Sequence, residues 1–147
     1  MMLLGADVIL KTLDLIVSGN VVLKKQDDSN ASPAPKITKN NCRINWNKPT
    51  LEIYNLIRGL SPYPAAFFIH NDNIYKIFKT KIPGNEKLSD IRSQFSIDSS
   101  SLNRFIQTKD EIYAMTLDGI LQILELQPEG RKRMTSEEFL RGNTLIN

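Results

Sequence analysis

The chain has 147 residues and a mass of 16.7 kDa. Its 19 Lys and Arg residues exceed its 16 Asp and Glu residues, which gives a net charge of +3 and a pI near 9.0. Hydrophobic residues make up 41% and charged residues 24%, as in ordinary globular proteins, which excludes wholesale disorder, a collagen-like fibre and a coiled coil. The single cysteine, Cys42, cannot form an internal disulfide, and one histidine leaves too few ligands for a zinc site. A reducing compartment is therefore favoured.

No targeting or membrane-spanning segment is predicted. The apolar run from Met1 to Leu4 is too short for a secretory signal, and Asp7 and Lys11 follow it closely. No stretch approaches the roughly 18 uninterrupted apolar residues of a transmembrane helix. We expect a cytoplasmic protein without a membrane partner.

Residues 1–25 are expected to form a helix and a short strand. Apolar residues recur at helical spacing over residues 3–18, and Gly19 or Asn20 can close the helix in a left-handed conformation. Residues 21–25, VVLKK, are expected to form an edge strand. A helix this apolar needs a covering sheet or partner helices, which the polar residues that follow cannot supply. We expect that partner to lie upstream, in residues missing from this chain.

Residues 26–40 are expected to link two packed units. The QDDSNASPAP stretch is polar, and Pro33 and Pro35 bias the residues before them toward extended backbone. Positive charge is then concentrated, because residues 29–51 contain no acidic residue but carry Lys36, Lys39, Arg43 and Lys48.

Residues 41–147 are expected to form the main domain, which begins with a helix. Pro49 suits the first helical position, and a 3.6-residue period continues to Leu60. Strand signals follow in AAFFIH, an Asn71-Asp72-Asn73 turn and IYKIFKTKI, which together predict a hairpin. Strict alternation along the second strand puts Ile74, Lys76, Phe78 and Thr80 on one face and Tyr75, Ile77, Lys79 and Lys81 on the other.

The C-terminal third of the chain contains further strand signals. Residues 83–101 are poorly patterned and expected to be mostly loop, in which LSDIRSQF could form one helical turn. Three strand candidates follow, LNRFIQT, EIYAMTL and GILQILELQ, with a hairpin signal at Leu117-Asp118-Gly119. Thr135 or Ser136 is expected to cap a short helix that ends at Gly142. The predicted fold is mainly β with short helices, arranged as a small antiparallel barrel of OB-like geometry.

The chain offers no catalytic constellation. Nucleophilic or acid–base catalysis needs a nucleophile beside a base, or two carboxylates in different environments. His70 ends a strand beside a polar turn, where a structural role is the ordinary interpretation, and Cys42 is interpreted as a plain thiol. No GxGxxG or phosphate-loop pattern is present. We predict no catalytic, cofactor-binding or metal-binding residue.

Positive charge is concentrated in three segments. Their cations are Lys36, Lys39, Arg43 and Lys48 in the first, Lys76, Lys79 and Lys81 in the second, and Arg131, Lys132 and Arg133 in the third. If the segments converge on one face, they form an anion-binding surface whose natural partner is nucleic acid. The alternative is a merely solvated basic surface. Tyr63, Phe67 and Tyr75 could stack on bases, although aromatic residues in strands more often belong to the core.

Separated motifs, in the right order, resemble the methionyl-tRNA formyltransferase family. RINW (Arg43 to Trp46) and IYNLIRGLSPYPAAF (Ile53 to Phe67) resemble the junction into the family's C-terminal domain. ILELQPEGRKRMTSEEFLRG (Ile123 to Gly142) resembles its closing signature. GADVILKTLDLIVSGN (Gly5 to Asn20) and APKI (Ala34 to Ile37) are similar to the last helix of its catalytic domain and the linker after it.

The resemblance implies a fold and a role. The family transfers a formyl group from 10-formyltetrahydrofolate to methionyl-initiator-tRNA in translation initiation, using Asn, His and Asp of an N-terminal Rossmann-like half that is absent here. Residues 1–25 would then be the end of that half, and residues 41–147 the OB-like tRNA-binding domain. The folate co-substrate would bind outside this chain. The implied partners are initiator methionyl-tRNA and the missing catalytic half.

The resemblance also implies which residues bind tRNA. It assigns that role to Lys36 of APKI, Arg58 of LIRGL and Lys132 of GRKRM, while Gln127 and Gly130 shape the turn before that run. Charge alone adds Lys39, Arg43, Lys76, Lys79, Lys81, Arg131 and Arg133.

Some positions depart from the family pattern, and two other functions stay open. Asn45 stands where the family usually has Asp, Ala65-Ala66 replaces a commoner Pro-Gly-Ala or similar, and residues 83–101 have no clear counterpart.

One alternative function is the C-terminal part of a formyltransferase acting on another amine, such as a nucleotide-linked amino sugar. The other is a stand-alone module that binds nucleic acid or protein.

Overall fold

The computed structural model describes residues 2–95 and 105–145, and it divides the chain into two units, Met1–Pro35 and Lys36–Asn147. The boundary falls within the segment predicted to be a linker, residues 26–40. Among the described residues, no helix is long and apolar enough to cross a membrane.

The first unit contains one helix, α1 (Met2–Val17), which confirms the predicted helix, and a short 3-10 turn, η1 (Asp28–Asn30). Gly19 has φ of 70°, and the N–H groups of Gly19 and Asn20 donate to carbonyls of the last helical turn at 3.1 Å each. This glycine-based C-cap is the one predicted. The expected edge strand is wrong, because residues 21–25 have no regular structure and pair with none of the described strands. The apolar side chains of α1 are exposed within its unit.

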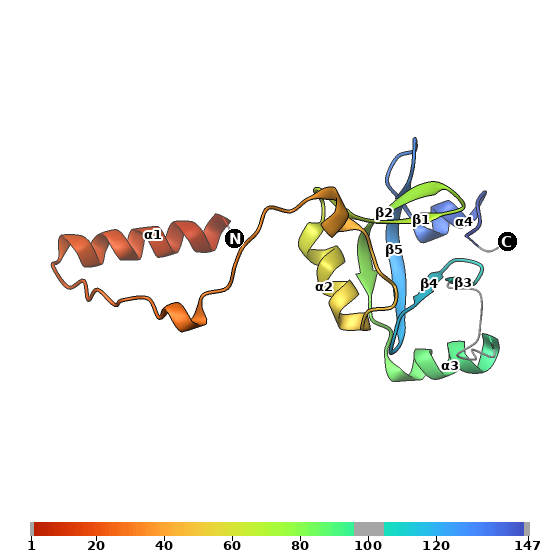
Figure 1. The fold of residues 1–147 in the computed structure, drawn as a ribbon, viewed down its shortest axis with the longest axis horizontal. Coiled ribbons are helices and arrows are strands. Elements are labelled where there is room, and N and C mark those ends of the chain that lie inside the picture. The colour runs from red at the N-terminus through yellow and green to blue at the C-terminus, as the bar shows by residue number, and fades with distance from the viewer. Residues whose placement is uncertain (1, 96–104, 146–147) are drawn as a thin grey trace. The chain divides into compact units, whose positions relative to one another are not determined.

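The second unit is a curled antiparallel sheet with short helices (Figure 1). Its elements are η2 (Lys39–Cys42), α2 (Thr50–Leu60), β1 (Ala66–His70), β2 (Asn73–Lys81), α3 (Asn85–Phe95), β3 (Phe105–Gln107), β4 (Ile112–Met115), β5 (Ile120–Pro128), β6 (Met134–Thr135) and α4 (Ser136–Leu140). The strand order is β1-β2-β5-β4-β3, with β6 on β5. All strand pairs are antiparallel, so the predicted small antiparallel barrel is confirmed as an open half-barrel.

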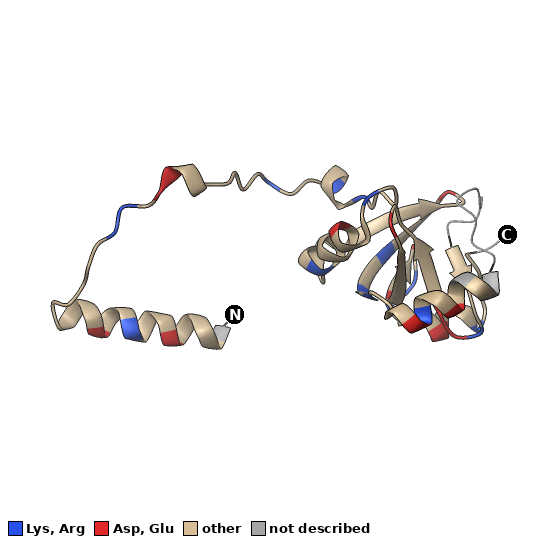
Figure 2. Cartoon of the chain, turned by 90° about the horizontal axis from the view of Figure 1, so that it is seen from below, with Lys and Arg blue, Asp and Glu red and all other residues tan. Residues whose placement is uncertain are grey.

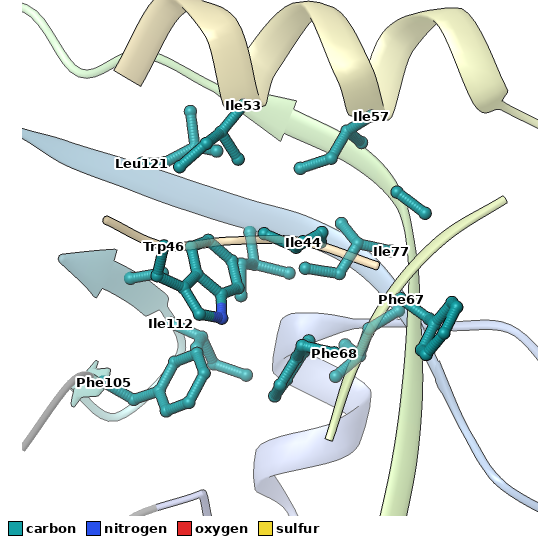
Figure 3. Close-up of a cluster of buried hydrophobic side chains, with 14 of the residues drawn as sticks. Ile44, Trp46, Ile53, Ile57, Phe67, Phe68, Ile77, Phe105, Ile112 and Leu121 are labelled. Atoms are coloured by element: carbon teal, nitrogen blue, oxygen red, sulfur yellow. The ribbon is translucent and has the colours of Figure 1, made fainter. Parts of the chain in front are cut away.

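The main core lies between α2 and the sheet (Figure 3). Ile53 and Ile57 of α2 are 2% and 0% exposed and point toward the strands, as their helical spacing predicted. Trp46 packs edge-on against Phe68 and Phe105, with ring centroids 5.6 and 5.7 Å apart. The core therefore joins α2, the segment before it, and strands from both ends of the sheet.

The β1–β2 hairpin forms as predicted, with a two-residue turn. Asn71 and Asp72 have φ of 48° and 61°, the left-handed conformation that such a turn requires. The predicted alternation along β2 is wrong after Ile77, because Phe78 is an extra residue between the pairs Ile77–Leu126 and Lys79–Glu125. Ile77 and Thr80 are consequently both buried, although strict alternation placed them on opposite faces.

Residues 85–95 form the helix α3, which corrects the expectation of a mostly irregular segment. Ile91 is 4% exposed and packs against Tyr113 of β4, and the Nζ atom of Lys87 lies 2.6 Å from Glu111 Oε1. Burial opposes the charged form of Glu111, but hydrogen bonds from Lys87 and Tyr113 outweigh it and lower the pKa. These tertiary contacts stabilise a full helix where the local pattern indicated at most one helical turn, in LSDIRSQF. The rest of the predicted loop, residues 96–101, and the start of LNRFIQT lie outside the described residues.

The predicted hairpin at residues 117–119 joins β4 to β5 and also positions the start of α2. Asp118 Oδ1 accepts hydrogen bonds from the backbone N–H and the hydroxyl of Thr50, both at 2.7 Å. These bonds hold the pKa of Asp118 below its ordinary value. A Cβ atom added at Gly119 would lie 2.9 Å from Thr50 Oγ1, so glycine is needed for this close approach.

Gly119→Ala is expected to lower the free energy of unfolding by about 1–3 kcal/mol, because the Thr50 hydroxyl that it would contact is buried and held by hydrogen bonds to Asp118 and Thr116. Gly59→Ala is the matched control, since a Cβ atom there meets nothing within 4 Å. That control should raise stability by about 0.5–1 kcal/mol by favouring the helix. Urea denaturation followed by Trp46 fluorescence measures both changes, and equal changes would contradict the close contact.

The C-terminal helix α4 confirms the predicted cap. Thr135 Oγ1 accepts the N–H of Glu138 at 3.2 Å, and the Glu138 carboxylate accepts the N–H of Thr135 at 2.8 Å. This reciprocal pair satisfies two backbone donors at the helix start.

Candidate nucleic-acid interface

All ten cations predicted to bind nucleic acid are exposed and belong to the second unit. Figure 2 shows basic positions along the segment that enters this unit, on α2 and on the strands. Of the ten, Arg133 alone forms an ion pair with a described residue, Glu125. The other nine therefore keep their charge available for an external anion.

One hollow of this surface is a cavity of about 510 Å³, here called the tyrosine pocket. It is lined by Ile37, Thr38, Lys39, Cys42, Tyr63, Pro64, Ala65, Phe67, Ile74, Lys76, Gln127, Pro128, Glu129 and Gly130. Lys39 comes from the first basic segment and Lys76 from the second. Lys76 also pairs with Gln127, four residues before Arg131 of the third segment, so parts of all three regions approach one another here.

A second, smaller hollow of about 280 Å³ contains Arg58 and Lys79 and is here called the arginine hollow. Its lining is Tyr54, Ile57, Arg58, Ser61, Phe78, Lys79 and Thr80. The guanidinium carbon of Arg133 lies 4.4 Å from the centroid of the Phe78 ring, a cation–π contact. Phe78 therefore lines this hollow together with residues of α2 and also contacts Arg133 of the third basic segment. Sequence reasoning missed Phe78, because no local signal marked the bulge.

The remaining cations lie outside these two hollows. Arg43 lines a third hollow together with Lys48, which is already paired with Glu52 at 2.6 Å. Arg131 donates to the side chain of Asn143 at 2.9 Å. Lys36, Lys81 and Lys132 are exposed and line none of the three hollows. The structure therefore groups four of the predicted residues in pairs, Lys39 with Lys76 and Arg58 with Lys79, and the other six line neither of these two hollows.

Of the three aromatic residues considered for base stacking, only Tyr63 is available, with 89% of its side chain exposed. Phe67 is buried, and Tyr75 stacks on Phe68 in the core with ring centroids 5.2 Å apart. The core interpretation is thus correct for Phe67 and Tyr75.

Cys42 and His70, the two residues considered for catalysis, both pack against other residues. Cys42 is 3% exposed, and its thiol donates to the Thr38 carbonyl at 3.3 Å, in keeping with a plain core thiol. His70 packs edge-on against Phe105, with ring centroids 5.4 Å apart. Within the described ranges, no group of three or more His, Cys, Asp and Glu side chains could hold a metal ion.

The family-specific positions have clear local roles. Gln127 Nε2 donates to the Arg131 carbonyl at 2.7 Å, and Gly130 has φ of 71°, so both shape the turn after β5 as predicted. Asn45 Oδ1 accepts the N–H of Asn47 at 3.0 Å, a role that an amide performs as well as a carboxylate. Ala65 has φ of 70°, a conformation that favours glycine.

Comparison with known proteins identifies the family of this chain. Residues 36–144 match the family described as the formyl transferase C-terminal domain. The chain is 40% identical to a methionyl-tRNA formyltransferase from Flavobacterium psychrophilum and 34% identical to one from Clostridioides difficile. These alignments cover 98% and 99% of this chain but 44% of each relative, so the chain spans under half their length.

The fold also resembles a solved structure. HypX from Aquifex aeolicus matches with a TM-score of 0.59 at 15% identity, over 92% of this chain and 23% of that one. At this identity the likeness concerns the fold alone. Together, the domain match and the antiparallel half-barrel lead to one conclusion: the chain belongs to the formyl transferase C-terminal domain family.

Proposed function

We propose that this chain is the tRNA-binding part of a methionyl-tRNA formyltransferase, which formylates methionyl-initiator-tRNA at the start of translation in the cytoplasm. The observation that carries the proposal is the set of nine exposed cations without an acidic partner among the described residues. Relatives named methionyl-tRNA formyltransferase support the choice of substrate.

The charge distribution suits a polyanion. Lys and Arg contacts to phosphates supply most of the sequence-independent affinity for nucleic acid, because each contact releases condensed counterions. Cations already neutralised by carboxylates contribute little, whereas the lysines of the tyrosine pocket and of β2 form no ion pair with any described residue. The surface should therefore bind RNA with a strong dependence on salt.

Formyl transfer itself is proposed to occur in residues outside this chain. The alignments leave more than half of each relative unmatched, and that remainder has room for a catalytic half and a 10-formyltetrahydrofolate site. In this proposal the present residues hold the tRNA, and the catalytic half carries out the chemistry.

A fluorescence-anisotropy titration against initiator tRNA, with a matched DNA duplex as control and a series of salt concentrations, tests the proposal. We expect binding that prefers tRNA and a linear fall of log affinity with log salt, at a slope of about 0.9 or less per phosphate contact. Absence of binding to tRNA at low salt would refute the proposed role.

A further inference from the structure

Tyr63 is a large aromatic side chain that the fold holds in solvent. It lies in the short connection between α2 and β1, whose two ends are fixed because Leu60 and Ala65 are buried and the Ala65 N–H donates to the Leu60 carbonyl at 2.9 Å. Pro62 and Pro64 flank Tyr63 and restrict the backbone on both sides. The ring is therefore presented by a stiff segment, with 89% of its surface exposed.

The tyrosine pocket lies beside this ring and has an apolar floor. Cys42, Phe67 and Pro128 are buried residues of its lining, while Lys39 and Lys76 of the lining are exposed. The volume of about 510 Å³ is within the range of pockets that hold small organic groups. An apolar cavity with an exposed aromatic ring and two cations fits a flat ring attached to an anion.

Two side chains of the lining offer hydrogen-bond acceptors. Gln127 uses its amide N–H for the Arg131 carbonyl, which leaves its oxygen for a ligand. Among the described residues, the Glu129 carboxylate receives one long hydrogen bond, 3.4 Å, from the Ile74 N–H. Both could accept from the amino groups that nucleobases carry on their edges.

We propose that the tyrosine pocket binds one unpaired nucleotide of an RNA. The base enters the cavity against Tyr63, and Lys39 and Lys76 contact its phosphates. A paired base inside a helix cannot enter, because its faces are stacked, so the pocket selects a single-stranded stretch or a loop. This inference rests on the proposed function and adds to it the part of the RNA that this site recognises.

Tyr63→Ala in the full chain tests the proposal against two probes, a short unstructured RNA and a blunt RNA duplex with the same number of phosphates. Affinity for the unstructured RNA should fall about tenfold, since one base loses its stacking platform. Affinity for the duplex should stay unchanged. Because Tyr63 is exposed, the substitution should leave the fold intact, which circular dichroism checks.

Tyr63→Trp provides the conservative counterpart. It should restore affinity for the unstructured RNA, and its emission should be quenched when that RNA binds, because a base stacks on the indole. Leu117→Trp, also exposed but outside the pocket lining, is the matched control and should not be quenched.

The outcomes separate this inference from the proposed function. If the unchanged chain binds neither the two RNA probes nor tRNA, the pocket inference and the proposed function are both refuted. If it binds both RNA probes and Tyr63→Ala binds them as well as the unchanged chain does, the pocket assignment fails while RNA binding stands. An equal loss on both probes also overturns it, since that result would mark Tyr63 as a general backbone contact.

Discussion

Ile57→Ala is expected to lower the free energy of unfolding by about 2–5 kcal/mol. Ile57 is 0% exposed and lies in the last turn of α2, pointing into the core that joins this helix to the sheet (Figure 3). The cost combines the lost burial of the removed carbon atoms with the cavity left behind, because a close-packed core relaxes only in part. Urea denaturation of the full chain, followed by Trp46 fluorescence, measures the change.

Leu51→Ala is the matched control for this substitution. Leu51 belongs to the same helix but is 60% exposed, so its removal should change stability by about 0.5 kcal/mol or less. Both substitutions introduce alanine, so their helix propensities change little by comparison with the expected difference. Equal effects of the two would contradict the packing of α2 on the sheet.

Reversing the charges of Lys76 and Lys79 together should weaken tRNA binding by about 100-fold at low salt. Both side chains are exposed on β2 and have no acidic partner among the described residues, so each replacement by glutamate removes an attraction and adds a repulsion. The slope of log affinity against log salt should fall by about one for each lost phosphate contact. Anisotropy titrations over a salt series give both quantities.

The matched control reverses Lys48 and Arg141, which changes the net charge by the same amount. These cations are paired with Glu52 at 2.6 Å and Glu137 at 2.7 Å, so their charges are already partly neutralised. The control should reduce affinity far less and leave the slope nearly unchanged. If both double variants lost affinity equally, the effect would come from overall charge, and the solvated-surface alternative would be preferred.

Elements with local signals were predictable from the sequence. The end of α1 at Gly19, the turn at Asn71-Asp72 and the cap at Thr135 each depend on residues within a few positions of one another. Their conformations follow from left-handed backbone preference and short-range hydrogen bonds, which are read directly from residue type. The cations of the candidate interface were predictable for a similar reason, because Lys and Arg are seldom buried.

Elements that depend on distant partners were not predictable. Residues 21–25 have strand-forming composition but pair with no described strand, and a single strand has no hydrogen bonds to stabilise it. The helix α3 depends on Ile91 and Lys87 reaching β4 and the residue before it. The bulge at Phe78 exists only because β2 and β5 pair with a shifted register.

The sequence by itself determined that this chain has an apolar helix, a polar connection and an antiparallel β domain with excess positive charge, because composition and local periodicity encode these properties. Only the tertiary structure decided which cations line the same hollow. Lys39 and Lys76 line the tyrosine pocket, and Arg58 and Lys79 line the arginine hollow, because η2, α2 and β2 pack together. It also decided that Tyr63 is exposed while Phe67 is buried, since exposure depends on what packs against a side chain and not on the side chain alone.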